Sequence, residues 1–485
     1  MSDHVCAQRH AKRRGYVAGL ASLLATLCPL VVIALMSGNA VKAAPVVNVR
    51  AIPAFARKYG MPCSSCHEAW PKLSPFGQMF KDNGYQLMND RDAPIYQQPA
   101  YWPVTFRMTT FWHRENTNRL QVDDPTSTTG GQIEANYTAH GFDYSGLDFH
   151  TGGTVAKNIS FYLLPSSDPL GNFHFETVMV RLDNLAGSSW INVKLGKFEL
   201  DNLLSEKRIL TISSHGGFYQ NYHFQPATEN PGFFTTGIGN NQIGAEWMGH
   251  SKDDRTRLSA AVLSSTDGNP TLPTSRGYDT FLAGSQAFEV GGLGVQRVGA
   301  FAYFGQAPTY YQLNEGGAPV PGTGIGNKGY YRLGLIGMWY FKKLDFTTMY
   351  FHGSDSAYLG TNTAANQALP TGARNPTWNG ALIETHYTYS PQIILINRYE
   401  AIRMTQQALP VVAGVGFVPG VSVPSTDFGN IDAVTFGFRY YPFISTRAGF
   451  AYHSEYSWVR QRGTSPVTGQ DLTGSSLMFG FDFDF

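Results

Sequence analysis

The sequence has few charged residues and no concentration of basic residues of the kind that binds nucleic acid. Only 15% of its 485 residues are charged, whereas soluble globular proteins carry roughly 25%. The formal net charge is +1 and the basic residues are scattered along the chain, which argues against nucleic-acid binding. Aromatic residues reach 14% and there are 52 glycines, so the shortage of charge is matched by an excess of residues that suit apolar surfaces and turns.

Long apolar runs are also scarce. Beyond residue 43 no run of about 20 apolar residues offers a transmembrane helix. The one such run, Val17–Met36, follows a basic cluster and precedes small residues that end at Ala43. This order is typical of a secretory signal peptide, and we expect cleavage after Ala43. A single membrane anchor is the alternative, which the interruption at Pro29 disfavours.

Cysteine is confined to one motif once residues 1–43 are removed. Cys63 and Cys66 then remain, in the stretch "MPCSSCHEAW", which excludes a disulfide scaffold and a zinc site of four thiolates. In Cys-x-x-Cys-His the two thiols form thioethers with a haem and the adjacent histidine ligates its iron. A dithiol redox pair would be expected beside a βαβ pattern, which is absent. The motif therefore predicts one covalent haem c, with His67 as the iron ligand.

Residues 44–100 read as one small haem-binding unit. Short helices are predicted from Pro53 to Gly60 and from Ser74 to Asn83-Gly84. The second iron ligand stays open between Met79, Met88 and a histidine of the barrel wall formed by residues 101–485. Fewer than 60 residues bury little core, so we expect this unit to need a bound group or a surrounding wall.

From Tyr101 onward the pattern has period two. The final segment, "SLMFGFDFDF", places Leu477, Phe479, Phe481, Phe483 and Phe485 on one face and polar or small residues on the other. The same alternation is found in 191–196, 434–441 and 448–453, whereas 173–182 and 392–401 alternate poorly. Such strands face either lipid or a protein core.

Turn signals predict the number of strands. Seven short turns lie near 156–158, 183–189, 251–255, 291–294, 342–343, 390–391 and 442–445. Longer polar segments lie near 114–145, 166–172, 199–241, 264–284, 305–328, 354–378, 405–431 and 460–474. Short turns on one side and long loops on the other predict an all-β fold: a transmembrane antiparallel β-barrel of about 16 strands over residues 101–485, in the outer membrane. A soluble propeller or sandwich is the alternative.

A family resemblance follows from these features. The stretch "PAFARKYGMPCSSCHEAWPKLSPFGQMFKDNGYQL", between a signal peptide and a barrel of about sixteen strands, resembles the iron-oxidising outer-membrane c-type cytochromes of acidophilic bacteria, which are fused monohaem cytochrome–porins. The specific part is the haem segment with its flanks, which include Phe55-Ala56-Arg57, Phe76-Gly77 and Gly84-Tyr85. The resemblance implies oxidoreductase-type oxidation of extracellular Fe(II), with the electron passed to a periplasmic c-type cytochrome. It transfers no Fe(II)-binding residue.

Two other functions fit the same sequence. One is a solute porin with an accessory haem unit, and the other is outward electron transfer to extracellular metal. Because a hydrocarbon layer about 30 Å thick insulates the two sides, a single haem can connect them only from within that layer. We therefore expect the haem unit to plug the lumen of the barrel.

Overall fold

The computed structural model describes residues 54–61, 63–69, 72–87, 104–167, 170–200, 241–264, 277–309, 326–361, 363–390, 392–409, 430–444, 449–462 and 471–484. The predicted signal peptide, residues 1–43, lies outside this part, as do Met88 and Phe485. Residues 50–485 form one compact unit. No helix within the described ranges is long and apolar enough to span a membrane.

The N-terminal part contains short helices at the predicted positions. They are α2 (Ala54–Tyr59), α3 (Cys63–Cys66) and α4 (Pro75–Asp82), with a small antiparallel pair, β1 (His67–Ala69) and β2 (Lys72–Leu73), between the last two. Helix α2 ends at Gly60, whose φ of +64° suits glycine. Helix α4 begins with Pro75 after Ser74, whose hydroxyl accepts a hydrogen bond from the Gly77 amide. Both predicted helices are confirmed.

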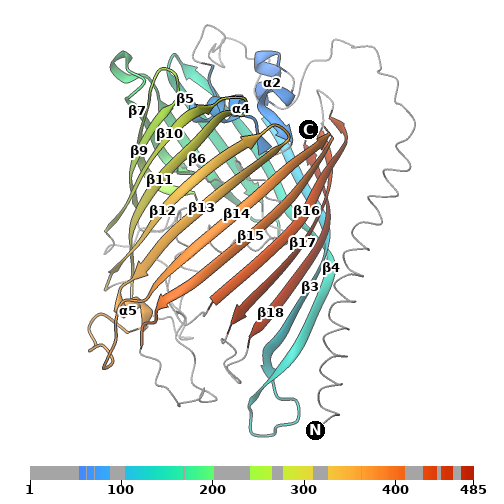
Figure 1. Ribbon diagram of the computed structural model, residues 1–485, viewed down its shortest axis with the longest axis vertical. Coiled ribbons are helices and arrows are strands. Elements are labelled where there is room, and N and C mark those ends of the chain that lie inside the picture. Colours follow the sequence, from blue (N-terminus) through green and yellow to red (C-terminus); the bar gives the residue numbers. More distant parts are fainter. Residues whose placement is uncertain are drawn as a thin grey trace. The chain divides into compact units, whose positions relative to one another are not determined.

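Sixteen antiparallel strands form a closed barrel (Figure 1), in which β18 pairs with β3. The predicted number of strands and their antiparallel order are confirmed. The strands are β3 (Val104–Asp123), β4 (Gln132–Ala156), β5 (Ile159–Ser167), β6 (Phe173–Leu182), β7 (Asn192–Phe198), β8 (Gln242–His250), β9 (Thr256–Ser264), β10 (Tyr278–Val290), β11 (Gly294–Ala307), β12 (Lys328–Phe341), β13 (Leu344–Asp355), β14 (Thr377–Ser390), β15 (Ile393–Gln406), β16 (Asn430–Ile444), β17 (Gly449–Arg462) and β18 (Leu472–Asp484).

The connections alternate in length around the barrel. Six of the seven predicted short turns join neighbouring strands where expected, and the seventh, near 442–445, extends beyond the described residues. The short helices η3 (Leu185–Gly187) and α5 (Ala357–Gly360) lie in two of the connections. The predicted long loop 114–145 is wrong, because β3 and β4 stay paired out to Asp123 and Gln132. Backbone pairing and side-chain hydrogen bonds, such as the one from the Thr138 hydroxyl to the Asn116 side chain at 2.9 Å, hold this polar extension.

The two faces of the barrel wall differ as the alternation predicts. Ile191, Leu195, Phe436, Phe481 and Phe483 are exposed on the outside. Sequence neighbours such as Asn192, Lys194, Thr435 and Asp482 point inward and are buried. A closed barrel with an apolar outer face and polar inward positions is an outer-membrane β-barrel, and this confirms the predicted location.

The outward position of Leu335 gives a test of this assignment. Leu335 lies midway along β12 and is 62% exposed. We expect Leu335→Arg to lower the free energy of unfolding in lipid vesicles by about 2–4 kcal/mol, because arginine at the bilayer midplane is poorly solvated. Tyr278, at the long-loop end of β10 and 73% exposed, is the matched control. Tyr278→Arg should change that free energy by about 0–1 kcal/mol, and equal effects at both positions would contradict the membrane placement.

Candidate functional site: the Cys-x-x-Cys-His segment and the barrel lumen

The cysteine motif forms a single helical turn. Cys63 and Cys66 are the first and last residues of α3, and His67 begins β1 directly after it. Positions three apart lie on one face of a helix, and this backbone spacing suits two thioether bonds to one haem. Cys66 is half-buried, whereas the side chains of Cys63 and His67 lie outside the described part. The backbone therefore fits a covalently held haem.

Helix α4 packs backbone to backbone against this turn. The Ser74 amide donates to the Cys66 carbonyl at 2.8 Å, and the Ser74 hydroxyl donates to the Ser65 carbonyl at 2.9 Å. A Cβ atom at Gly77 would lie 1.9 Å from the Cys66 carbonyl oxygen. Glycine is required at position 77 because any side chain would push α4 away from the motif.

Four aromatic rings form a core beside the motif. Phe80 of α4 packs edge-on against Phe55 and Tyr59 of α2, with ring centroids 5.3 Å apart in each pair. Tyr85 stacks on Phe55 at 5.0 Å. These rings supply the apolar surroundings that a haem prefers. Met79, a candidate iron ligand, is half-buried on α4, and the choice among Met79, Met88 and a histidine stays open.

No metal-ligand geometry built from several side chains is found among the residues that the structure describes. Among those residues, no group of three or more histidine, cysteine, aspartate or glutamate side chains is placed to hold a metal ion. An Fe(II) site built from several protein side chains is therefore not identified in this part of the chain.

The segment after α4 contacts the inward face of the barrel wall. Tyr85 stacks on Tyr162 of β5, with ring centroids 4.7 Å apart. The Gln86 side-chain amide donates to Asp183 at 2.8 Å, next to the inward Arg181. These positions face the lumen because Arg181, which pairs with Ser160, is buried, whereas its neighbour Val180 is 45% exposed on the outside. The contacts are consistent with the predicted place of the haem unit inside the barrel.

Two lysines hold the helices to the same wall. The Lys58 ammonium of α2 donates to the Thr154 hydroxyl of β4 at 3.0 Å. Lys81 of α4 forms an ion pair with Glu199, directly after β7. Thr154 is fully buried. The helical segment is thus attached to β4–β7, through contacts that lie on both sides of the cysteine motif in sequence.

Gly84 allows the closest approach to the wall. Its φ is +70°, and a Cβ there would lie 2.7 Å from the Ser160 hydroxyl and 2.8 Å from Cδ of Arg181. A larger residue at this position meets both backbone strain and a direct overlap. Tyr85 follows with φ of +60°, which turns its ring toward Tyr162.

Asp183, which accepts a hydrogen bond from the helical segment, makes the stability of the folded chain depend on pH. It lies in the connection after β6 and is buried with Arg181 and Gln86 as partners. Burial raises the pKa of Asp183 above its ordinary value, although the charge of Arg181 and the hydrogen bonds from Arg181 and Gln86 oppose that rise. Folding therefore favours the protonated carboxyl. The stabilisation is fully present below the ordinary value of 3.8 and is lost as pH rises through the raised pKa.

We expect Asp183→Asn to remove this pH dependence. In the wild-type chain the free energy of unfolding should fall as pH rises through the raised pKa of Asp183, whereas the variant should lack that component, measured by denaturant titrations between about pH 3 and about pH 7. Asp253, exposed in the β8–β9 turn, is the control, because the Ser251 hydroxyl bond lowers its pKa. Asp253→Asn should remove a small component of the opposite sign. An unchanged slope in Asp183→Asn would contradict the assignment.

A buried ionic cluster lies on the inward face of β14–β17. Arg398 contacts Glu384 at 3.1 Å, Glu400 at 3.2 Å and Glu455 at 4.0 Å. All four side chains are almost fully buried. We call these four residues the Arg398 cluster. One guanidinium therefore balances carboxylates from three strands, and His386 extends the cluster with a 2.6 Å contact to Glu384.

The inward face near the long loops is largely apolar. Arg332 lies over the rings of Tyr330, at 5.1 Å, and Trp378, at 4.5 Å, and pairs with Asp355 at 3.0 Å. Other inward hydrophobic side chains are buried around them: Phe281, Phe301, Tyr303, Phe351 and Ile402. These inward positions are buried, whereas side chains that line a water-filled channel are wetted.

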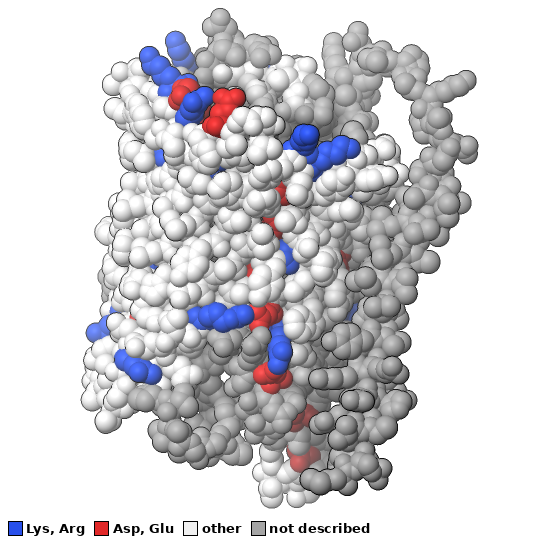
Figure 2. Space-filling model, viewed as in Figure 1, with Lys and Arg blue, Asp and Glu red and all other residues white. Residues whose placement is uncertain are grey.

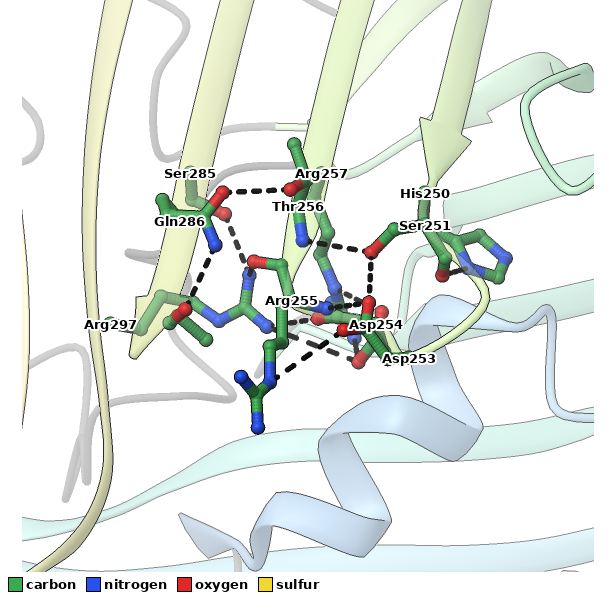
Figure 3. Close-up of polar contacts among 11 residues, drawn as sticks. His250, Ser251, Asp253, Asp254, Arg255, Thr256, Arg257, Ser285, Gln286 and Arg297 are labelled. Atoms are coloured by element: carbon green, nitrogen blue, oxygen red, sulfur yellow. Dashed lines mark hydrogen bonds and ion pairs between the residues drawn. The ribbon is translucent and has the colours of Figure 1, made fainter. Parts of the chain in front are cut away.

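The β8–β9 turn shows how polar groups at the short-turn end are used. Asp254 has φ of +56° and pairs with Arg257. Arg297 donates to the Asp254 carbonyl and, at 3.3 Å, to the Arg255 carbonyl (Figure 3). Both guanidiniums are engaged in holding the turn, so this group of charges is structural.

The similarity of this chain to known proteins is structural and distant. No protein-family model matches the chain. No curated protein sequence matches it either. Among solved structures it is similar to an anion-selective porin from Comamonas acidovorans, with 11% identity and a TM-score of 0.47 over 79% of this chain and 99% of that one. It is similar to OprB from Pseudomonas putida, with 9% identity and a TM-score of 0.42 over 84% of this chain and 96% of that one. It is also similar to the outer-membrane channel DcaP of Acinetobacter baumannii, with 10% identity and a TM-score of 0.41 over 78% of this chain and 97% of that one. At such identities and scores, what those proteins transport says nothing about this chain.

Proposed function

We propose that this outer-membrane barrel is an electron-transfer protein. It takes electrons from extracellular Fe(II) through one covalent haem c, held by Cys63, Cys66 and His67, and passes them to a periplasmic c-type cytochrome. The observation that carries the proposal is the Cys-x-x-Cys-His turn on a segment that contacts the inward face of the barrel wall. When bound, the haem supplies a centre that accepts and releases one electron at a time.

The residues of the chain supply position and surroundings. Tyr85, Gln86 and Lys81 attach the segment to the wall, which would place the motif between the two sides of the membrane. The aromatic core beside the motif lowers the local polarity, which favours the reduced state of a bound haem and raises its potential. Such a raised potential is what acceptance of electrons from Fe(II) requires.

The direct test is reduction of the purified protein. Oxidised, haem-loaded protein is mixed with ferrous iron at acidic pH while the haem absorption bands are followed. Reduction on mixing supports the proposal, and a band that stays in the oxidised position ends it. Outward electron transfer is distinguished by the measured potential, because a centre well below that of the iron couple cannot accept its electrons.

A solute porin with an accessory haem unit is the second candidate. It is favoured by the sixteen-stranded barrel with charged side chains on its inward face, the architecture in which porins form aqueous channels. Conductance in planar bilayers separates the two functions. An open porin passes ions steadily, whereas a plugged barrel conducts poorly until Gly84→Val loosens the contact with Ser160 and Arg181.

A further inference from the structure

A short row of charges crosses the outside of the barrel near the long-loop ends of β15–β18. Arg403 of β15 pairs with Asp432 of β16, and Asp432 lies opposite Arg460 of β17 in the strand register. Arg460 pairs in turn with Asp471, just before β18. Figure 2 shows blue and red side chains side by side in the lower half of this face, on a mostly white surface. We call these four residues the outer charge row.

The row faces outward. The Arg403 side chain is 39% exposed and its neighbour Ile402 is fully buried on the inward face. The Arg460 side chain is 42% exposed. Both arginines therefore stand on the membrane-facing side of the wall, where charged groups are rare.

The position along the strands matches the edge of the lipid layer. Arg403 is ten residues beyond Ile393, the first residue of β15 after a short turn. Ten residues rise about 34 Å along a strand, and a tilt of about 40° reduces this to about 26 Å across the membrane. The apolar band of such barrels is about 25 Å tall. The row therefore lies at the level of the lipid headgroups on the long-loop side, which in these barrels is the outer side.

Aromatic side chains line the wall directly below the row. Tyr399 and Phe436 are exposed outward positions on β15 and β16. Tyr399 also donates a hydrogen bond to Asp432 at 2.9 Å. A charged group above and exposed rings below match an amphiphile with a polar head and acyl chains.

The two guanidiniums are held in fixed orientations. Nη1 of Arg403 donates to the carbonyls of Ile402 and Ile431, at 2.9 and 2.7 Å. Asp471 binds Nε and Nη2 of Arg460, and among the described residues no hydrogen bond engages the Nη1 atom of Arg460. A planar guanidinium fixed in this way matches the oxygens of a phosphate group, and little side-chain entropy is lost on binding.

We propose that Arg403 and Arg460 bind the phosphate of an outer-leaflet lipid, whose acyl chains lie against Tyr399 and Phe436. Asp432 and Asp471 keep the row near neutral when no lipid is bound, and they orient the guanidiniums. This site is independent of the haem and of electron transfer. The same chemistry would suit free inorganic phosphate, and the experiment separates the two sources.

The test uses the full-length protein, purified in detergent and stripped of lipid. Binding of lipid A, the phosphorylated anchor of lipopolysaccharide, is compared with binding of its dephosphorylated form by native mass spectrometry. We expect the phosphorylated form to bind at least about tenfold more tightly, as for two charge-assisted hydrogen bonds. The double variant Arg403→Gln/Arg460→Gln should lose that preference, whereas Arg374→Gln, in the loop after α5, should keep it.

Two results would overturn the proposal. One is equal binding of both lipid forms, which needs no variant and so decides the matter even if the double variant fails to fold. The other is full displacement of the lipid by millimolar inorganic phosphate, which would assign the row to a free anion. The Arg403→Lys/Arg460→Lys variant should bind the phosphorylated lipid with intermediate affinity, because it keeps the charges and loses the planar donors.

Discussion

Replacing Cys63 and Cys66 together by serine should leave the chain without covalent haem. Both thioether bonds depend on these sulfurs, and no other cysteine follows residue 66. Haem staining of denatured protein on a gel should therefore be abolished. His67→Ala should keep the covalent haem, since both sulfurs remain, and should shift its absorption bands because one iron ligand is lost.

Matched controls lie in the same chain. Cys6 and Cys28 fall in the segment predicted to be removed on export, so their replacement by serine should leave the haem content unchanged. Covalent haem in Cys63→Ser/Cys66→Ser would contradict the assignment of the motif. The reverse result, in which Cys28→Ser removes the haem, would show that the wrong pair was identified.

Loss of the thioether bonds should also affect how the helical segment is held in the barrel. Helix α4 packs on the Cys66 carbonyl through Gly77, and the strip from Gly84 to Gln86 packs on the barrel wall. A haem bonded to α3 would therefore be anchored to the wall through α4 and that strip. Loss of the thioethers should loosen the helical segment, and ion conductance should rise together with the loss of haem.

The barrel could be predicted from the sequence where hydropathy alternates. In β18, apolar outward residues alternate with small or acidic inward ones, such as Phe481 with Asp482, and the structure has these faces. In β15 the inward face mixes Ile394 and Ile396 with Arg398 and Glu400. Inward positions of a filled lumen accept both kinds of residue, so hydropathy does not identify the face there.

The candidate site could be predicted only in its chemistry. The spacing of the motif identifies Cys63, Cys66 and His67 from the sequence alone. The wall residues that contact the segment, Tyr162 and Asp183, are far from it in sequence. Such contacts depend on the register of several strands, which local patterns do not determine. Gly84 and Tyr85 belong to the flanks of the motif that carry the family resemblance, and they are the only sequence signal for the contact of residues 84–86 with the wall.

Arg398→Met should produce the largest loss of stability in the barrel. The guanidinium contacts Glu384, Glu400 and Glu455 inside the wall. Methionine occupies a similar volume but leaves these buried carboxylates without that positive charge. Removing one member of a buried ionic group costs about 3–5 kcal/mol, and we expect the free energy of unfolding in detergent to fall by about this amount.

Controls separate charge imbalance from simple truncation. Arg374→Met, at an arginine in the loop after α5, should change the same free energy by no more than about 0.5 kcal/mol. Adding Glu400→Gln to Arg398→Met should recover part of the lost free energy of unfolding, because one of the buried negative charges is removed. An Arg398→Met chain as stable as the wild type would show that the lumen is wet enough to solvate three carboxylates. In that case the barrel would resemble an open channel at this level, and the solute porin would become the better account of its function.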